Sequence, residues 1–383
     1  MDSRAYWIWL SSCLGAGARV DTVLAAYPTA RELYEAGPSD WRLSGVFSNK
    51  QINQLCSVEP ERAKVNIDLC NKNGWHIVTP EDSEYPALLS DISSPPLVLY
   101  VWGDLSFVND TLPLAVVGTR NPVRDSETIT RKLCCEMAAA GVTIVSGGAL
   151  GIDSAAHDGA LNGGGKTVSV LGCGLGERYL SRNAELFSQI SKNGAVISEF
   201  APFASATTRT FPIRNRIISG MSRGTLVVEA GERSGSLITA HFAADQGRDI
   251  FAVPGNIVSS AYVGANRLIR DGAKAVTCAE DILNEYSLLY PDMINIAKLR
   301  EKSEELSQKH TSPVFAAPKP KTAISGVSPT AARVYEFISY DPIHTDDIII
   351  NTGLPVGDVV CALTELELSD YIVALPGKLY TVK

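Results

Sequence analysis

The chain of 383 residues is long enough for about two to four domains of the usual 100 to 200 residues each. Its 45% hydrophobic and 20% charged residues are typical of a folded globular protein and exclude collagen-like, coiled-coil and disordered chains. The net charge of -8, from 34 basic and 42 acidic residues, argues against a protein that coats nucleic acid over its whole surface.

The cysteines and the apolar runs indicate the compartment. The eight cysteines form no Cys-x-x-Cys pair and no cluster with histidines, so we expect reduced thiols and no metal site. The longest apolar runs, such as residues 97–102, are much shorter than the ~20 residues of a membrane span. The acidic start lacks the basic region of a signal peptide. We therefore expect a cytoplasmic protein that does not enter the membrane.

Residues 1–75 form the first predicted region, a module of short helices. The stretch Leu14-Gly15-Ala16-Gly17-Ala18 precedes an apolar helix at residues 20–26, which is the spacing of a helix-hairpin-helix. Backbone amides in such a loop can contact a phosphate. A small module with a purely structural role explains the same residues, and both interpretations stay open.

Residues 76–111 carry six acids, no Lys or Arg, and the pairs Tyr85-Pro86 and Pro95-Pro96. Prolines at this density favour extended or turning chain over helix. We interpret this region as an acidic connector.

Residues 112–290 alternate short apolar runs with segments of helical length. The runs are residues 114–117, 142–145, 167–171, 195–198, 225–229, 250–253 and 273–277. Strands that alternate with helices predict an α/β domain with a doubly wound parallel sheet. Ligands bind beyond the carboxyl ends of such strands, so the turns 118–120, 146–148, 172–174 and 254–256 are expected to line one crevice.

The last two regions differ from the sheet domain. Residues 291–325 lose the periodicity and gather lysines and prolines, which predicts a flexible linker. Residues 326–383 show three helices and a terminal hairpin, the pattern of a winged helix. Its expected recognition helix, residues 356–369, has three acids and no basic residue. Repulsion from duplex phosphates therefore favours a protein-docking or regulatory role.

The strongest local signal is a basic stretch. Residues 200–228 contain Arg209, Arg214, Arg216 and Arg223 and no acid. Phe203 and Phe211 lie among them, and aromatic faces beside guanidinium groups suit stacked bases and their phosphates. Single-stranded nucleic acid is therefore the leading ligand. The alternative for Arg214 and Arg216 is an internal ion pair with Glu199 or Glu229.

Other polar residues are candidates for an anion site or for catalysis. Ser234, Gly235 and Ser236 open a helix, where free amides can bind an anion, although capping alone explains the serines. Asp153 and His157 share a helix face, and a structural hydrogen bond is favoured over a metal or acid-base role. Asp153 and Glu229 are the candidate general bases of a nucleotide-processing hydrolase, but neither has an evident nucleophile partner.

Five sequence blocks closely resemble the DNA processing protein A (DprA/Smf) family. They keep the family's order and lie at Ala115–Arg120, Val145–Asp153, Phe211–Gly220, Ser234–Ala240 and Val253–Asn256. The resemblance extends to the connector, the helical N-terminal module and the winged helix. Residues 123–126 and Tyr179-Leu180 depart from the family's Tyr-Gly and Tyr-Pro.

The resemblance implies an extended Rossmann-like domain flanked by a SAM-like or helix-hairpin-helix-like N-terminal module and a C-terminal winged helix. It implies a non-enzymatic single-stranded DNA-binding protein without cofactors, which forms a homodimer and helps load a RecA-type recombinase in natural transformation. A hydrolase and a winged-helix regulator of duplex DNA remain the alternatives. The expected DNA-binding residues are Gly118, Thr119, Arg120, Gly147, Gly148, Arg209, Phe211, Arg214, Asn215, Arg216, Ser234, Gly235 and Ser236.

Overall fold

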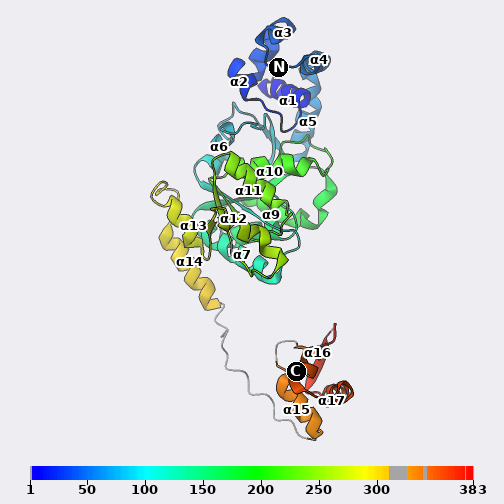
Figure 1. Ribbon diagram of the computed structural model, residues 1–383. Coiled ribbons are helices and arrows are strands. Elements are labelled where there is room, and N and C mark those ends of the chain that lie inside the picture. Colours follow the sequence, from blue (N-terminus) through cyan, green and yellow to red (C-terminus); the bar gives the residue numbers. More distant parts are fainter. Residues whose placement is uncertain (1, 310–325, 340–342, 376, 383) are drawn as a thin grey trace. The chain divides into compact units, whose positions relative to one another are not determined.

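The computed structural model describes residues 2–309, 326–339, 343–375 and 377–382 (Figure 1). The chain divides into two compact units, Met1–Gln308 and Lys309–Lys383, and each is described by itself. In the part of the chain that the structure describes, no single helix is long and apolar enough to cross a membrane.

The first unit begins with five helices. They are α1 (Ser3–Leu14), α2 (Asp21–Ala26), α3 (Ala30–Ser44), α4 (Asn49–Ser57) and α5 (Ala63–Asn73). Local sequence fixes several helix starts, because Asp2 caps α1 and Ser48 forms a capping box with Gln51 at the start of α4. Their apolar faces share one core, in which Trp7 and Trp9 are almost fully buried.

A nine-stranded sheet forms the centre of the first unit, in the order β1-β2-β6-β5-β4-β3-β7-β8-β9. The strands from β6 to β9 in this order are parallel, which confirms the predicted doubly wound α/β fold. Their bounds are β3 (Leu112–Val117), β4 (Val142–Ser146), β5 (Thr167–Leu171), β6 (Ala195–Ser198), β7 (Gly224–Val227), β8 (Asp249–Ala252) and β9 (Lys274–Ala275).

Helices cover both faces of this sheet, and alternate residues of β3 show the two cores. Leu114 and Val116 pack with α7 (Arg124–Ala139), α8 (Ile152–Asn162) and α13 (Ala279–Tyr286). Ala115 and Val117 belong to the opposite core with α10 (Thr210–Gly220) and α11 (Ser236–Asp245). The remaining α-helices between β3 and β9 are α9 (Ala184–Asn193) and α12 (Val263–Arg270). Burial on both faces explains why the parallel strands read as continuous apolar runs.

The region predicted as a connector contributes to the sheet. It contains β1 (His76–Val78), α6 (Ala87–Ser90) and β2 (Leu99–Gly103). β2 pairs antiparallel with both β1 and β6, so the sheet extends beyond the strands that alternation predicted. The prolines lie outside the two strands, where no ladder hydrogen bond is lost.

The predicted linker also differs from expectation over its first half. Residues Ile296–Lys309 form helix α14, and Leu299 is buried in the core beside α7 and α13. This part is therefore a packed helix and not a flexible linker. Residues 310–325 of the same prediction lie outside the described residues.

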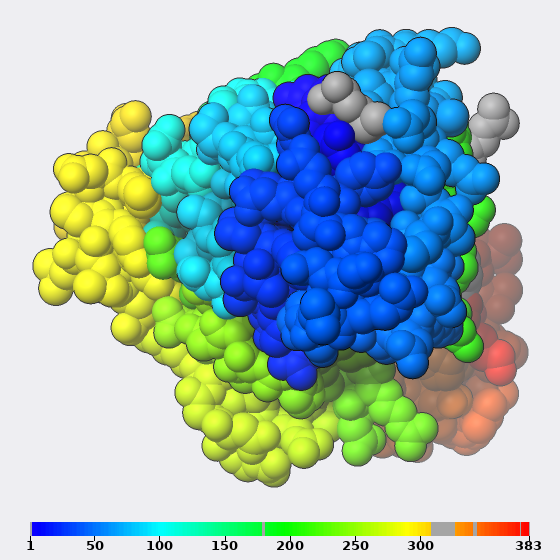
Figure 2. Space-filling model, turned by 90° about the horizontal axis from the view of Figure 1, so that it is seen from above, coloured from blue at the N-terminus to red at the C-terminus, as the bar shows by residue number. Residues whose placement is uncertain are grey.

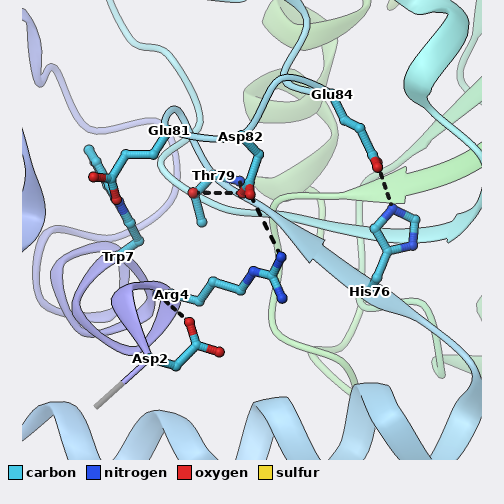
Figure 3. A network of polar contacts seen from close by, with 8 residues as sticks. All are labelled: Asp2, Arg4, Trp7, His76, Thr79, Glu81, Asp82 and Glu84. Atoms are coloured by element: carbon cyan, nitrogen blue, oxygen red, sulfur yellow. Dashed lines mark hydrogen bonds and ion pairs between the residues drawn. The ribbon is translucent and has the colours of Figure 1, made fainter.

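Polar contacts fasten α1 to the segment after β1 (Figure 3). The indole Nε1–H of Trp7 donates to Glu81 Oε2 at 2.6 Å, and Arg4 pairs with Asp82 at 3.6 Å. His76 Nε2 lies 3.0 Å from Glu84 Oε2. In the view of Figure 2 the helical module (blue) lies in front of cyan and green segments of the sheet domain.

The second unit has the helices and strands of a winged helix. They are α15 (Pro329–Phe337), α16 (Thr345–Thr352), α17 (Val356–Leu368), β10 (Ile343–His344), β11 (Ile372–Leu375) and β12 (Leu379–Val382). The strands form one sheet in the order β10-β12-β11, and Val334, Leu363 and Leu366 are buried in its core. The predicted C-terminal fold is thereby confirmed.

Candidate nucleic-acid interface

Two adjoining cavities lie at the carboxyl ends of β3, β4, β5 and β7. Their volumes are about 560 Å³ and about 220 Å³, and both are lined by Arg120, Ala149, Phe211 and Arg214. Ten of the thirteen expected site residues line these cavities: Gly118, Thr119, Arg120, Gly147, Phe211, Arg214, Asn215, Ser234, Gly235 and Ser236. A crevice therefore lies at the strand ends, lined by α10 and by residues of the turns 118–120, 146–148 and 172–174, whereas the fourth expected turn, 254–256, lines neither cavity.

Arg120 and Phe211 form the exposed part of the crevice. Arg120 follows β3 and is exposed, and its guanidinium carbon lies 4.9 Å from the centre of the Phe211 ring. Phe211 is half-buried and packs against Gly172, where a Cβ would come within 2.9 Å of the ring. A guanidinium over an aromatic ring presents both a planar surface and a positive charge.

Arg214 lies deeper, at the floor of both cavities. Its side chain is buried, and Nη1 donates to the carbonyl oxygen of Val170 at 2.6 Å. The backbone of Gly147 lies so close that a Cβ there would come within 2.6 Å of both Arg214 Cζ and Asp153 Oδ2. Burial raises the pKa of Asp153, and the charge of Arg214 acts in the opposite direction. Glycine at 147 is therefore required by close packing.

Arg216 points away from the cavities. It is buried, and its Nη2 donates to both carboxylate oxygens of Glu199, at 2.5 and 2.6 Å. Burial raises the pKa of Glu199, and the charge of Arg216 opposes this. The internal ion pair considered from the sequence is thus present for Arg216. Arg214 points in another direction, because positions 214 and 216 lie about 200° apart around a helix.

Two further expected residues do not line the cavities. Arg209 is exposed at the start of α10, outside both linings. Gly148 is buried, with a φ of 66°, and its carbonyl oxygen accepts a hydrogen bond from Asn183 Nδ2 at 3.0 Å. Its conformation shapes the turn after β4.

The start of α11 forms the opposite side of the larger cavity. The hydroxyls of Ser234 and Ser236 lie 2.8 Å apart, and Ser234 Oγ accepts the backbone N–H of Ser236 at 3.4 Å. Asn215 Nδ2 donates to the Gly235 carbonyl at 3.5 Å. Both serines thus line the cavity, and Ser234 accepts the first amide of α11, whose N-cap residue Gly235 has no side-chain cap.

The candidate catalytic groups are held in structural contacts. Glu229 is buried, and its Oε2 accepts the backbone N–H of Val123 at 3.1 Å. His157 is fully buried with Nδ1 2.7 Å from Thr167 Oγ1, and burial lowers its pKa to about 3. Among the described residues, no three His, Cys, Asp or Glu side chains are placed to hold a metal ion.

Sequence reasoning missed several residues that line the cavities. They include Asn121, Leu150, Thr208 and Ile238. Asn121 and Leu150 lie beside the strand-end turns singled out in the sequence, and that position is the signal that could have found them.

Comparison with known proteins adds the family. Residues 76–287 match the model of DNA recombination-mediator protein A, and residues 317–378 match the DprA winged helix domain. The chain is 31% identical over 395 residues to protein Smf of Synechocystis, covering 99% of this chain and 98% of the relative.

Two solved structures are also similar. The X-ray structure of DNA processing protein A from Streptococcus pneumoniae matches with a TM-score of 0.64 and 32% identity, covering 73% of this chain and 97% of that one. A structure of DNA processing protein A from Helicobacter pylori matches with a TM-score of 0.50 and 31% identity, covering 56% and 97%; its title describes a single-stranded DNA binding mode.

Proposed function

Because the chain belongs to the DNA recombination-mediator protein A (DprA/Smf) family, we propose that it binds single-stranded DNA, without catalysis, in the crevice at the strand ends. One observation carries this proposal. The exposed guanidinium of Arg120 lies over Phe211 at the mouth of a cavity that also contains the start of α11. An unpaired base can stack on such a surface while its phosphate meets the guanidinium.

The charge distribution supports a single-stranded ligand over a duplex. No acid occurs in residues 200–228, which include α10, whereas residues 326–383 contain three basic and eight acidic residues. Recognition helix α17 contains no basic residue and would approach duplex phosphates against repulsion. The winged helix therefore fits a docking or regulatory role better than a role in reading duplex DNA.

The carboxylates of Glu229 and Asp153 both accept backbone hydrogen bonds, which supports a non-enzymatic role. Glu229 accepts a backbone hydrogen bond, and Asp153 is buried beside Arg214 with its Oδ2 accepting from the Ala149 N–H at 3.3 Å. A general base must reach the proton that it removes, and both groups already serve the turns.

The proposal includes partners. We expect a homodimer that helps a RecA-type recombinase load on single-stranded DNA during natural transformation, which would place the protein in the cytoplasm. For the dimer, α12 offers the half-exposed Val263, and the preceding loop exposes Ile257 and Val258. Light scattering should give about twice the 41.0 kDa of one chain, and a monomer at micromolar concentration would contradict the dimer.

A gel shift tests the central part of the proposal. The purified chain is titrated against a poly-dT oligonucleotide and against its duplex at two salt concentrations, beside a nucleotide-hydrolysis assay. Preferential binding of poly-dT without turnover is expected. Turnover of nucleotide without DNA binding would instead favour the hydrolase alternative.

A further inference from the structure

The loop between α1 and α2 contacts the back of the helix that lines the crevice. The backbone N–H of Gly17 donates to Glu199 Oε1 at 3.2 Å, and Gly17 has a φ of 75°. A Cβ at this position would lie 2.9 Å from Ile213 Cγ2 and 3.6 Å from Arg216 Nε. Ile213 and Arg216 both belong to α10. Glycine at 17 therefore permits both the left-handed turn and the close approach.

The Gly17 amide donates to a buried ion pair, Arg216–Glu199, which has few other hydrogen bonds. Glu199 receives both hydrogen bonds from Arg216 Nη2 and the one from Gly17. Among the described residues, Nε and Nη1 of Arg216 have no hydrogen-bond partner. A buried ion pair is stabilising only when its remaining polar atoms are well satisfied, so the Gly17 amide is a substantial part of what holds Glu199 in place.

The two faces of α10 make this contact relevant to the crevice. Phe211, Arg214 and Asn215 line the cavities, whereas Ile213 and Arg216 face the N-terminal loop. A rigid helix shifts as a unit, so a displacement at Ile213 also moves the residues beside it. A shift of about 1 Å in a binding side chain is sufficient to weaken a preorganised site.

Other contacts of the N-terminal module reach the same side of the domain. Leu175, in the turn that also contributes Gly172 and Cys173 to the smaller cavity, packs against the core that the module shares with residues 77–100. The rings of Trp75 and Phe203 lie 6.3 Å apart, and Phe203 is in the segment between β6 and α10. The module thus contacts the segment before α10 and α10 itself, and its core extends to the turn after β5.

We propose that Gly17 is a positioning residue for nucleic-acid binding: its amide and its lack of a side chain seat α10, so that the N-terminal module sets the affinity of a crevice that it does not line. This inference rests on the proposed binding of single-stranded DNA. It is an alternative to the phosphate-contact interpretation of this loop, because the Gly17 N–H donates to Glu199.

Gly15 supplies a matched control in the same loop. It too has a positive φ, of 84°, but a Cβ there would meet nothing within 4 Å. Gly15→Ala therefore imposes backbone strain without a clash against α10, whereas Gly17→Ala imposes both. Glu199→Gln is a third variant, which changes the acceptor of the Gly17 hydrogen bond. Its neutral amide leaves the buried charge of Arg216 unpaired.

The experiment measures binding of fluorescent dT oligonucleotide by the full chain and each variant at several salt concentrations, with melting temperatures recorded. We expect Gly17→Ala and Glu199→Gln to bind about fivefold or more weakly, with the salt slope of wild type, and Gly15→Ala to bind within about twofold. Equal affinities of Gly17→Ala and Gly15→Ala would overturn the inference, even if Glu199→Gln binds weakly. A reduced salt slope in Gly17→Ala would also overturn it, because the loop would then contact phosphate directly. Failure of the wild type to bind would refute the proposed function instead.

Discussion

Arg120 and Phe211 should contribute to DNA binding as a coupled pair. Base stacking on an aromatic ring is worth about 1 to 3 kcal/mol, so Phe211→Ala should weaken poly-dT binding by roughly fivefold or more. Because the Arg120 guanidinium lies 4.9 Å from the ring centre, removing the ring also removes one contact that orients Arg120. A cation–π contact at an exposed site is worth about 0.5 to 1 kcal/mol. The double variant should therefore lose about that much less than the sum of the two single losses.

Salt dependence separates the two contributions. Arg120→Ala should reduce the slope of log affinity against log salt by about 0.7, the value for one phosphate on a single strand, whereas Phe211→Ala should leave it nearly unchanged. Arg42→Ala is the control, because Arg42 is an exposed arginine on α3 of the N-terminal module. Melting temperatures identify any loss that comes from the packing of Phe211 against Gly172. Wild-type affinity in a folded Arg120→Ala or Phe211→Ala variant would refute the placement of the site.

Three further predictions follow from the same geometry. Gly147→Ala should abolish most binding and lower the melting temperature, because its Cβ would overlap Arg214 and Asp153; normal binding in this variant would exclude Arg214 from the site. Between pH 7 and pH 5, the free energy of unfolding should fall by about 2 kcal/mol more in wild type than in His157→Gln. The pKa of His157 is about 3 in the folded state and near 6.5 in the unfolded chain, so protonation favours unfolding. Equal pH dependence of the two proteins in urea titrations would contradict this. Deleting residues 324–383 should change poly-dT affinity by less than about threefold, because α17 contains no basic residue, and a loss of tenfold or more, about 1.4 kcal/mol, would assign DNA contacts to the winged helix.

The parallel strands could be predicted closely from the sequence because both of their faces are buried. The apolar runs at 167–171 and 195–198 coincide with β5 and β6, and the turns after β3, β4 and β5 that were singled out in the sequence line the crevice. β1 and β2 could not be predicted in this way. They are short antiparallel strands in a proline-rich acidic segment. β1 pairs with β2, and β2 pairs with β6, which is a long-range contact that local composition does not reveal.

For the site, the sequence could not predict the direction in which the arginines of α10 point. The acid-free stretch predicted a basic surface, yet Arg214 and Arg216 are both buried, and the acid that pairs with Arg216 lies at position 199, outside that stretch. Only the fold brings Glu199 and Gly17 together at Arg216, across 182 positions of sequence. The sequence also favoured helix-breaking chain over residues 291–325, whereas burial of Leu299 stabilises α14.

Photocrosslinking tests the central claim most directly. A dT oligonucleotide with photoreactive thymines is bound to the full-length wild-type chain, irradiated and digested, and the crosslinked peptides are identified by mass spectrometry. Crosslinks are expected in the turn after β3, at residues 118–121, and at the start of α10, at residues 208–215. Crosslinks confined to the N-terminal helices or to residues 326–383, with none in those two segments, would contradict single-stranded DNA binding in the strand-end crevice.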